Sequence, residues 1–383
     1  MSKTSPVILQ ILPHLGAGGA EQGAIDVAAE IIRAGAKSIV VSNGGNRVPE
    51  LKRSGTIHID LPVDSKNPYV MWRNAAKLRK IIKKHGVDIV HARSRAPAWS
   101  ALEACKGTKA HFMTTCHAPY NIHGRKLKRF YNSSIARGER VIAISEFVAD
   151  YLRSNYEIDA DKIRQIHRGI PVEKFNPSLV TAERMMALAK SWRIPDGATV
   201  ILLPGRLTRW KGQSVLIEAM SKVLKDTGRT DLFCVLVGAD QGRVEYRAEL
   251  EQLIANRKLG EYVRMMDHCA DMATAYMVSE IVVSASIEPE GFGRIPVEGQ
   301  AMGKIVIATE HGGAKETVIP NESGFLIPVN DADAMAEAIK KALDLSPEER
   351  DAMARRGMEN VYENFSRAVM VGKTLDVYTE LLQ

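Results

Sequence analysis

The sequence has few aromatic residues and no closely spaced cysteines. Its four cysteines, Cys105, Cys116, Cys234 and Cys269, contain no Cys-x-x-Cys pair, so neither a zinc cluster nor a disulfide framework is indicated. We expect reduced, mostly buried thiols. Aromatic residues make up 6% of the chain and no nucleic-acid-binding motif is present, so surfaces on which bases could stack are scarce. We therefore predict no nucleic-acid partner.

Long apolar runs are also absent. No run approaches the roughly 18 to 20 residues that span a bilayer, and residues 1–6 carry no hydrophobic signal segment. We therefore expect a cytoplasmic protein. The 383 residues, of which 45% are hydrophobic and 25% charged, suit a soluble protein with two domains of roughly 150 to 200 residues each.

Charge is divided unevenly along the chain. Residues 1–175 carry 28 Lys and Arg against 15 Asp and Glu, whereas residues 176–383 carry 24 against 30. A basic half beside an acidic half indicates that the first half faces an anionic partner, such as a phospholipid surface or an anionic acceptor. Nucleic acid is the rival interpretation, which the scarcity of aromatic residues disfavours.

Short apolar runs alternate with helical patterns along the whole chain. A first strand at 7–12 is followed by a glycine loop and a helix at 20–33, and this alternation predicts an α/β fold with doubly wound parallel sheets. A Pro-containing connection at 168–177 separates two such halves. We predict Rossmann-like domains at 1–175 and 176–365, and a C-terminal helix at 366–383 that packs back on the first domain.

A glycine-rich loop with two glutamates follows the strand expected at 281–284. Gly291 and Gly293 let the backbone approach a ligand closely, and free amides at a helix start suit a diphosphate. Glu290 is expected in the loop and Glu298 about two turns into the helix, so both can face one cleft. From spacing alone, a glycine turn with solvated carboxylates is the alternative.

A basic loop at 205–212 follows the strand expected at 200–203. Ligands bind at the carboxyl ends of strands in open α/β sheets. Arg206 can grip a phosphate with its planar fork of donors, and Lys211 adds a point charge. Taken alone, a solvated basic loop is the alternative.

Together these segments resemble glycosyltransferase family 4, whose members have the GT-B fold and retain the anomeric configuration of the transferred sugar. The resemblance rests on an ordered set of motifs that spans nearly the whole chain. In chain order these are Gly18-Gly19-Ala20-Glu21, Ser145-Glu146, the connection 169–177, Gly205-Arg206, Lys211-Gly212, Glu290, Glu298, Gly303 and the segment 311–317. The resemblance implies two Rossmann-like domains with an interdomain cleft, and a place among bacterial lipopolysaccharide and envelope glycosyltransferases.

The resemblance also implies roles in the second half, which would bind a nucleotide-sugar donor carrying UDP or GDP. Arg206 and Lys211 would hold the diphosphate, and Glu298 would bind the ribose hydroxyls. Glu290 would contact the transferred sugar, aided by backbone amides of the segment Gly291, Phe292 and Gly293.

In the first half, the resemblance implies that His117 faces the sugar and that Gly18 and Gly19 approach the phosphate or the acceptor. Catalytic roles are thus expected for His117, Arg206, Lys211 and Glu290. We interpret the remaining histidines that follow or flank expected strands, His91, His123 and His167, as structural.

No metal and no other cofactor is expected. Many glycosyltransferases hold a metal with an Asp-x-Asp motif, and triplets of this kind occur at 159–161 and 331–333. The first falls in an expected turn and the second fits a helix N-cap, so both are interpreted as structural. Arg206, Lys211 and helix-start amides would replace the metal electrostatically. No second carboxylate can be assigned as a nucleophile opposite Glu290, which favours front-face attack in a closed, water-free site.

The expected acceptor is a hydroxyl of a lipopolysaccharide-core or other envelope glycolipid. Family members that act on membrane glycolipids carry basic patches on the acceptor domain. The residues Arg125, Lys126, Lys128 and Arg129, together with the segment 77–84, would form such a patch for the acceptor or for the inner face of the plasma membrane. A solvated charged surface is the alternative.

Other functions remain open. A same-fold hydrolase, phosphorylase or epimerase of nucleotide sugars is one, and a non-enzymatic protein that binds anionic surfaces is another. A dehydrogenase is disfavoured, because Glu21 stands where the third glycine of the dinucleotide fingerprint belongs.

Overall fold

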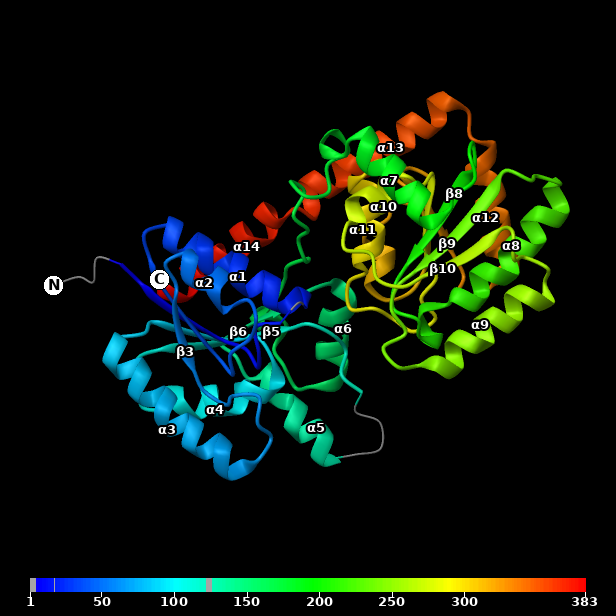
Figure 1. Ribbon diagram of the computed structural model, residues 1–383. Coiled ribbons are helices and arrows are strands. Elements are labelled where there is room, and N and C mark those ends of the chain that lie inside the picture. The colour runs from blue at the N-terminus through cyan, green and yellow to red at the C-terminus, as the bar shows by residue number, and fades with distance from the viewer. Residues whose placement is uncertain (1–4, 17, 122–125) are drawn as a thin grey trace. The chain divides into compact units, whose positions relative to one another are not determined.

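The computed structural model describes residues 5–16, 18–121 and 126–383 (Figure 1). The chain divides into two compact units, the first formed by Met1–Gly169 with Arg367–Gln383 and the second by Ile170–Ser366. Each unit is built on its own parallel sheet. The predicted α/β class with two Rossmann-like, parallel-sheet domains is confirmed.

The first unit contains a seven-stranded sheet with the order β3-β2-β1-β4-β5-β6-β7. Its strands are β1 (Val7–Ile11), β2 (Lys37–Ser42), β3 (Ile57–Asp60), β4 (Ile89–Ala92), β5 (His111–Cys116), β6 (Arg140–Ala143) and β7 (Ile163–Gln165). Its helices are α1 (Gly19–Arg33), α2 (Val48–Arg53), α3 (Pro68–His85), α4 (Arg95–Cys105), α5 (Lys126–Asn132), α6 (Glu146–Asn155) and α14 (Arg367–Leu382), with short 3-10 turns at Ser133–Ala136 and Ala160–Lys162.

Helices cover both faces of this sheet. Helices α1, α2 and α14 lie on one face, and α3, α4 and α5 on the other (Figure 1). The central strands β1 and β4 are buried throughout because both their faces are covered. The sequence pattern does not predict the edge strands β3 and β7. No residue of β3 is buried, and β7 (Ile-Arg-Gln) has a single apolar residue, so neither has a strong apolar pattern.

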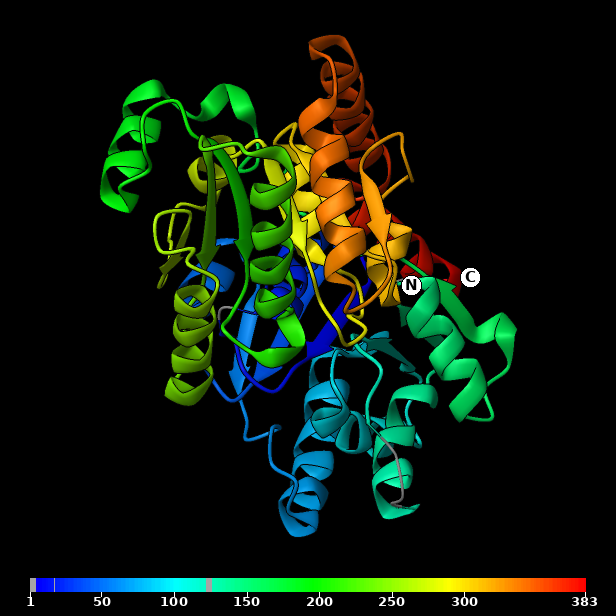
Figure 2. The same cartoon turned by 90° about the vertical axis from the view of Figure 1, so that its right-hand side faces the viewer.

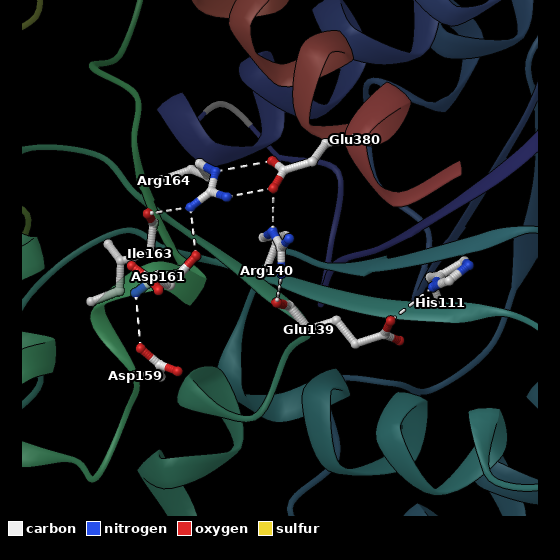
Figure 3. Close-up of polar contacts among 8 residues, drawn as sticks. All are labelled: His111, Glu139, Arg140, Asp159, Asp161, Ile163, Arg164 and Glu380. Atoms are coloured by element: carbon white, nitrogen blue, oxygen red, sulfur yellow. Dashed lines mark hydrogen bonds and ion pairs between the residues drawn. The ribbon is translucent and has the colours of Figure 1, made fainter. Parts of the chain in front are cut away.

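The C-terminal helix α14 is held to the first unit by polar contacts. Glu380 accepts hydrogen bonds from Arg140 Nε at 2.7 Å and Arg164 Nε at 2.9 Å, which brings β6 and β7 under the helix (Figure 3). On the same helix, the Tyr378 hydroxyl lies 2.7 Å from Nδ1 of the buried His91. The helix also contributes Tyr378 and Leu381 to the apolar core beside α1.

The second unit contains a six-stranded sheet with the order β10-β9-β8-β11-β12-β13. Its strands are β8 (Thr199–Pro204), β9 (Leu232–Val237), β10 (Val263–Met266), β11 (Ile281–Ser284), β12 (Ile305–Thr309) and β13 (Phe325–Ile327). Its helices are α7 (Ala182–Trp192), α8 (Gln213–Thr227), α9 (Val244–Asn256), α10 (Met272–Met277), α11 (Arg294–Ala301), α12 (Ala332–Asp344) and α13 (Pro347–Asn364), with 3-10 turns at Pro177–Leu179, Arg209–Lys211 and Gly312–Glu316. Helices α8 and α12 pack side by side against the sheet (Figure 2).

Local capping explains several helix starts in this unit. Asp331 Oδ1 accepts a hydrogen bond of 2.8 Å from the Ala334 amide and so caps α12, as expected from the sequence. Ser346 and Glu349 form a capping box at the start of α13. Helix α11 begins later than expected, because Gly293 at its N-cap has a φ of 85°, outside helical geometry. Glu298 is therefore the fifth residue of α11 and lies little more than one turn into the helix, not two.

The connection between the halves packs on the second unit from Ile170 onward. The Ile170 amide donates a hydrogen bond of 2.9 Å to the Phe365 carbonyl, and the Phe175 ring meets the Tyr276 ring edge-on at 6.0 Å. The division therefore falls earlier along the chain than the boundary expected at residue 175. No helix in the described part of the chain is long and apolar enough to cross a membrane.

Candidate functional site

The two loops singled out in the sequence follow neighbouring strands of the second sheet. Strands β8 and β11 pair in parallel, and the chain continues from β8 toward β9 but from β11 toward β12 on the other side. The crevice at such a switch in strand order, beyond the carboxyl ends of the strands, is where ligands bind in open α/β sheets. The loop after β8 carries Arg206 and Lys211, and the loop after β11 carries Glu290.

These two loops touch directly. The Ile287 amide donates a hydrogen bond of 2.7 Å to the Trp210 carbonyl. Gly212 has a φ of 70°, and a Cβ atom there would lie 2.0 Å from the Ala285 carbonyl oxygen. Only glycine allows this approach, since both the backbone conformation and the space exclude a side chain.

Lys211 and Glu290 form an ion pair at this switch point. Lys211 Nζ lies 2.7 Å from Glu290 Oε1, and the two side chains are only 10% and 19% exposed. The Ser286 hydroxyl donates a further hydrogen bond of 2.5 Å to the same Glu290 oxygen. On its other side, the Lys211 ammonium lies 4.4 Å from the centre of the Trp210 ring. These contacts fix the orientation of both side chains before any ligand binds.

A third loop, after β12, completes this arrangement. The Gly313 amide donates a hydrogen bond of 2.8 Å to the Glu290 carbonyl. Gly312 has a φ of 59°, and a Cβ atom there would lie 2.5 Å from the same carbonyl oxygen. The glycines of the 311–317 motif therefore allow this loop to pack closely against the Glu290 backbone.

Arg206 and Glu298 line a pocket of about 420 Å³ in the second unit. Gly238, His268 and Tyr276 also contribute to its wall. Arg206 is exposed, and its Nη1 lies 3.5 Å from Gln241 Oε1. The structure thus brings the four charged residues together as two sets: Lys211 pairs with Glu290, whereas Arg206 and Glu298 share the pocket.

Glu298 is buried and held at both oxygens. The Tyr276 hydroxyl donates a hydrogen bond of 2.8 Å to Oε2, and Arg294 Nη2 donates one of 2.5 Å to Oε1. Burial raises the pKa of Tyr276 well above its usual value, so the phenol keeps its proton and remains a donor. The i, i+4 spacing of Arg294 and Glu298 is a signal in the sequence that could have found this pair.

The glycine segment before α11 has two different functions in the structure. Gly293 turns the chain into the helix, whereas the Phe292 side chain is buried and meets the Phe365 ring at 5.7 Å. Phe292 can therefore reach a ligand through its backbone but not through its ring. The sequence analysis did not identify Tyr276, Ser286 or Trp210. The first two lie in apolar or small-residue stretches without a motif. Trp210 lies between the two cations Arg206 and Lys211, which are the stronger signals of that loop.

In the first unit, Gly18 and Gly19 form the start of α1 at the carboxyl end of β1. Gly18 is the N-cap, without a side-chain cap, and a Cβ atom there would lie 2.2 Å from Glu21 Oε2. The Glu21 carboxylate therefore covers Gly18 in this structure. The order of the sheet also reverses here, between β1 and β4.

His117 directly follows β5 and is held by Arg168. Arg168 Nη2 lies 3.0 Å from His117 Nδ1. Burial, helped by the charges of Arg168 and Arg93, holds the pKa of His117 well below its usual value. Because a guanidinium can only donate, Nδ1 is the acceptor and Nε2 carries the proton. Nε2 is buried and has no hydrogen-bond partner among the described residues.

The other histidines behave differently. His91 Nε2 lies 2.7 Å from the Thr115 hydroxyl and its Nδ1 contacts Tyr378, so both ring nitrogens are engaged within the first unit. His167 Nε2 lies 2.8 Å from Gln165 Nε2. His123 and Arg125 lie outside the described residues. Of the predicted basic patch, Lys126, Lys128 and Arg129 are exposed on α5.

Both Asp-x-Asp triplets are used by the local fold. Asp159 Oδ1 accepts a hydrogen bond of 3.1 Å from the Asp161 amide in a 3-10 turn (Figure 3), and Asp333 pairs with Lys222. The four cysteines are free, and three of them are buried. Within residues 5–16, 18–121 and 126–383, no three His, Cys, Asp or Glu side chains are grouped as metal ligands would be.

Comparison with known proteins identifies the family. A model described as Glycosyltransferase Family 4 matches residues 17–174, and one described as Glycosyl transferases group 1 matches residues 186–360. A glycosyltransferase crystal structure from Rickettsia africae is 41% identical, covers 100% of both chains and superposes with a TM-score of 0.91.

Other proteins are more distantly similar. HepE of Anabaena, solved in complex with UDP-glucose, is 21% identical with a TM-score of 0.80, over 98% of this chain and 99% of its own. A D-inositol 3-phosphate glycosyltransferase of Saccharomonospora viridis is 28% identical over 65% of this chain, and the match spans 57% of that relative's length. The chain belongs to the glycosyltransferases of family 4, with the GT-B fold.

Proposed function

We propose that this protein transfers a sugar from a nucleotide diphosphate donor to a hydroxyl of an anionic envelope glycolipid, with retention of configuration and without a metal ion. The observation that carries the proposal is the Lys211–Glu290 pair, 2.7 Å apart at the switch point of the second sheet, next to a pocket lined by Arg206 and Glu298.

The ion pair suits a diphosphate that arrives beside a sugar. Without a ligand, the Lys211 charge is met by Glu290. A diphosphate carries more negative charge than one carboxylate, so it would draw Lys211 away, and the exposed Arg206 can swing to the same anion. Glu290 would keep its hydrogen bond from Ser286 and would have an oxygen free to accept from a sugar hydroxyl.

The neighbouring pocket suits a nucleoside. A carboxylate held at both oxygens, as in Glu298, can accept hydrogen bonds from the two adjacent ribose hydroxyls through its remaining lone pairs. The base would lie toward Gly238 and His268 in the same pocket. HepE supports a uridine nucleotide as the first donor to test, with GDP-sugars second.

Charge develops on both sides of the bond that breaks, and the protein must stabilise it. As the bond between the anomeric carbon and the phosphate oxygen breaks, negative charge grows on phosphate, where Arg206, Lys211 and the α11 amides would stabilise it. The acceptor oxygen would attack from the same face, and its proton would pass to the departing phosphate oxygen. We also propose that the neutral His117 ring donates a hydrogen bond from Nε2 to the substrate.

An anionic acceptor fits the charge of the first half, where Lys and Arg exceed Asp and Glu by 28 to 15 over residues 1–175. The relative from Saccharomonospora viridis is named for a phosphorylated acceptor, which supports the same class. A lipopolysaccharide core or a related envelope glycolipid carries such charge, and peripheral contact with the inner membrane face would bring the cytoplasmic enzyme to it.

The first experiment is a thermal-shift screen with UDP, GDP, ADP and their sugars. A ligand at 100 times its dissociation constant stabilises the folded state by about 2.7 kcal/mol. We expect a shift with one nucleotide and with its sugar, no requirement for added Mg²⁺, and loss of the shift in Arg206→Ala. If no nucleotide diphosphate shifts the transition, the proposal is wrong.

Product analysis separates the same-fold alternatives. A transferase releases nucleotide diphosphate in proportion to sugar on the acceptor and leaves the α- or β-configuration of the donor unchanged. A hydrolase releases free sugar without any acceptor, and an epimerase converts one nucleotide sugar to another. A binding protein without activity would show none of these products.

A further inference from the structure

A buried cation lies at the switch point of the first sheet. Arg93 directly follows β4, and the strand order reverses between β4 and its neighbour β1. Only 5% of Arg93 is exposed. The crevice beyond the carboxyl ends of the strands at such a switch is where open α/β sheets bind ligands. Arg93 therefore stands where a substrate of the first unit is expected.

The charge of Arg93 has no close counter-charge. Gln10 Oε1 accepts a hydrogen bond of 2.9 Å from Arg93 Nη1. The buried Nε has no partner among the described residues, and Arg93 joins no ion pair there. The carboxylates of Asp26 and Glu21 act on the guanidinium only from a distance, and Asp26 is paired with Arg367 at 3.1 Å. Because a buried charge without a counter-charge costs free energy, a structural role alone does not account for this arginine.

The surroundings of Arg93 are built to hold it. Gln10 is fully buried in the apolar strand β1, and its Nε2 donates a hydrogen bond of 3.0 Å to the Ala24 carbonyl. This second contact orients the amide so that its oxygen meets the guanidinium. In α1, a Cβ atom at Gly23 would lie 3.2 Å from Arg93 Nη2. Neither a polar residue in a buried strand nor a glycine inside a helix favours stability, and here both accommodate one side chain.

One edge of the guanidinium is without a partner. Nη1 is engaged by Gln10, whereas Nε and Nη2 have no hydrogen-bond acceptor among the described residues. The N–H bonds of Nε and Nη2 are parallel and match two oxygens of one carboxylate or phosphate. Burial lowers the pKa of Arg93, yet a guanidinium stays charged at neutral pH. This edge therefore suits an oxyanion that enters the crevice and is shielded from water there.

Arg93 also lies close to His117. The two residues follow β4 and β5, which pair in parallel, so both stand at the same edge of the sheet. After burial and the charge of Arg168, the charge of Arg93 is the next cause that holds the pKa of His117 down. An oxyanion bound at Arg93 would therefore lie beside the histidine that is proposed to meet the substrate.

We infer that Arg93 binds an oxyanion of the acceptor, a phosphate or a carboxylate, within the first unit and close to the hydroxyl that receives the sugar. The assignment to the acceptor rests on the proposed transfer reaction, whereas the anion site itself does not depend on the donor. Arg93 is thus a specificity-determining residue, because an acceptor without this anion leaves the guanidinium without a counter-charge.

The stability of the ligand-free chain separates a binding role from a structural one. Arg93→Met removes a desolvated charge and keeps an apolar stem, so the urea midpoint of the first unit should stay the same or rise. Arg140→Met is the matched control in the same unit, because Arg140 is paired with Glu380 at 2.7 Å and its loss should lower the midpoint. A fall in Arg93→Met as large as in the control would show a structural role and overturn the inference.

Hydrogen exchange with peptide resolution locates the anion. Millimolar phosphate or acetate, at constant ionic strength, should slow exchange severalfold in peptides that cover the end of β4 and the start of α4. The two probes distinguish a phosphate from a carboxylate. Arg93→Met should abolish the effect. Arg93→Lys keeps the charge but not the planar fork, and should weaken binding by on the order of tenfold. Protection by neither anion, or equal protection in Arg93→Met, would overturn the inference.

Transfer kinetics assign the anion to the acceptor. Arg93→Lys should raise the KM for the acceptor by on the order of tenfold and leave the KM for the donor and the nucleotide-induced thermal shift unchanged. Loss of that shift in Arg93→Lys would place the residue at the donor and contradict the assignment. Absence of the shift in the unaltered chain would instead refute the donor site, and the exchange result with phosphate or acetate would still stand.

Discussion

The ion pair between Lys211 and Glu290 joins residues 79 positions apart and leaves both groups poorly exposed. Breaking a partly buried pair by removing one partner costs more than the pair contributes, because the other charge is left without a counter-charge. At this site the remaining charge would be the Glu290 carboxylate. It would then repel the diphosphate that Lys211 is proposed to bind.

We therefore expect Lys211→Met to lower the transfer rate by about 10² to 10³, the range found when one preorganised donor is removed from developing charge. Steady-state kinetics with saturating donor would measure it. Lys222→Met serves as the control, because Lys222 also pairs with a carboxylate, Asp333, but on an exposed surface of the same unit. Equal activity in the two variants would contradict the assigned role.

How far single residues could be predicted depended on local motifs. Arg206, Lys211, Glu290 and Glu298 were chosen from loops that follow apolar strands, and the structure places all four around the switch point of one sheet or in its pocket. Their division into two sets was not predictable. Lys211 lies in the 3-10 turn Arg209–Lys211 and Glu298 in α11, and residue spacing does not report the direction of their side chains.

At the scale of elements, glycines set how closely the site loops approach. Gly212 and Gly228 both have positive φ, 70° and 63°, and flank the same helix, α8. A Cβ atom at Gly228 would meet nothing within 4 Å, whereas one at Gly212 would lie 2.0 Å from the Ala285 carbonyl oxygen. Alanine variants at the two positions therefore separate the energetic cost of backbone strain from the cost of losing the loop contact.

Gly228→Ala should lower the free energy of unfolding by about 1 kcal/mol, the cost of a left-handed backbone for alanine. Gly212→Ala should cost more than about 3 kcal/mol, because the loops after β8 and β11 must also move apart. Urea titration would measure both values. Similar losses in the two variants would show that the loop contact carries no energy.

The docking of α14 has its own pH dependence. Burial, together with the charge of Arg93, holds the pKa of His91 well below its usual value, so this ring is neutral in the folded state. The unfolded chain binds a proton at His91 below about pH 6.5, and the folded chain does not. Stability from this group is therefore present above that pH and is lost as the pH falls below it.

We expect the free energy of unfolding to fall by up to about 1.4 kcal/mol per pH unit below pH 6.5 on account of His91. In His91→Gln, whose amide can still meet the Tyr378 and Thr115 hydroxyls, this slope should be smaller. Denaturant titrations between pH 7.5 and 5.5 would show the difference.

Elements were predictable in proportion to their burial. Strands such as β1 and β11, buried at every position, were located within a residue or two. The edge strands β3 (Ile-His-Ile-Asp) and β7 (Ile-Arg-Gln) were missed because polar residues interrupt any apolar run in them. The start of α11 was misplaced because a glycine with positive φ, which no pattern reveals, delays the helix.

For the molecule as a whole, alternating strands and helices were enough to predict two parallel-sheet domains, because a βαβ crossover leaves few other solutions. The order of strands within each sheet does not follow from that alternation. It comes from packing of helices on both faces, and it brings the loops after β8 and β11 together. The candidate site therefore rests on the order of motifs along the chain, not on the alternation of strands and helices.

Two compact units with separate cores should unfold in separable steps, and the nucleotide of the donor is proposed to bind the second. UDP or the matching nucleotide at 100 times its dissociation constant should therefore stabilise the second unit by about 2.7 kcal/mol. Hydrogen exchange with peptide resolution can assign this gain. Slower exchange should be seen in the strands β8 and β11 and not in β1 and β4, and Arg206→Ala should abolish it. Equal protection of both sheets would mean that the nucleotide does not act through the second unit alone.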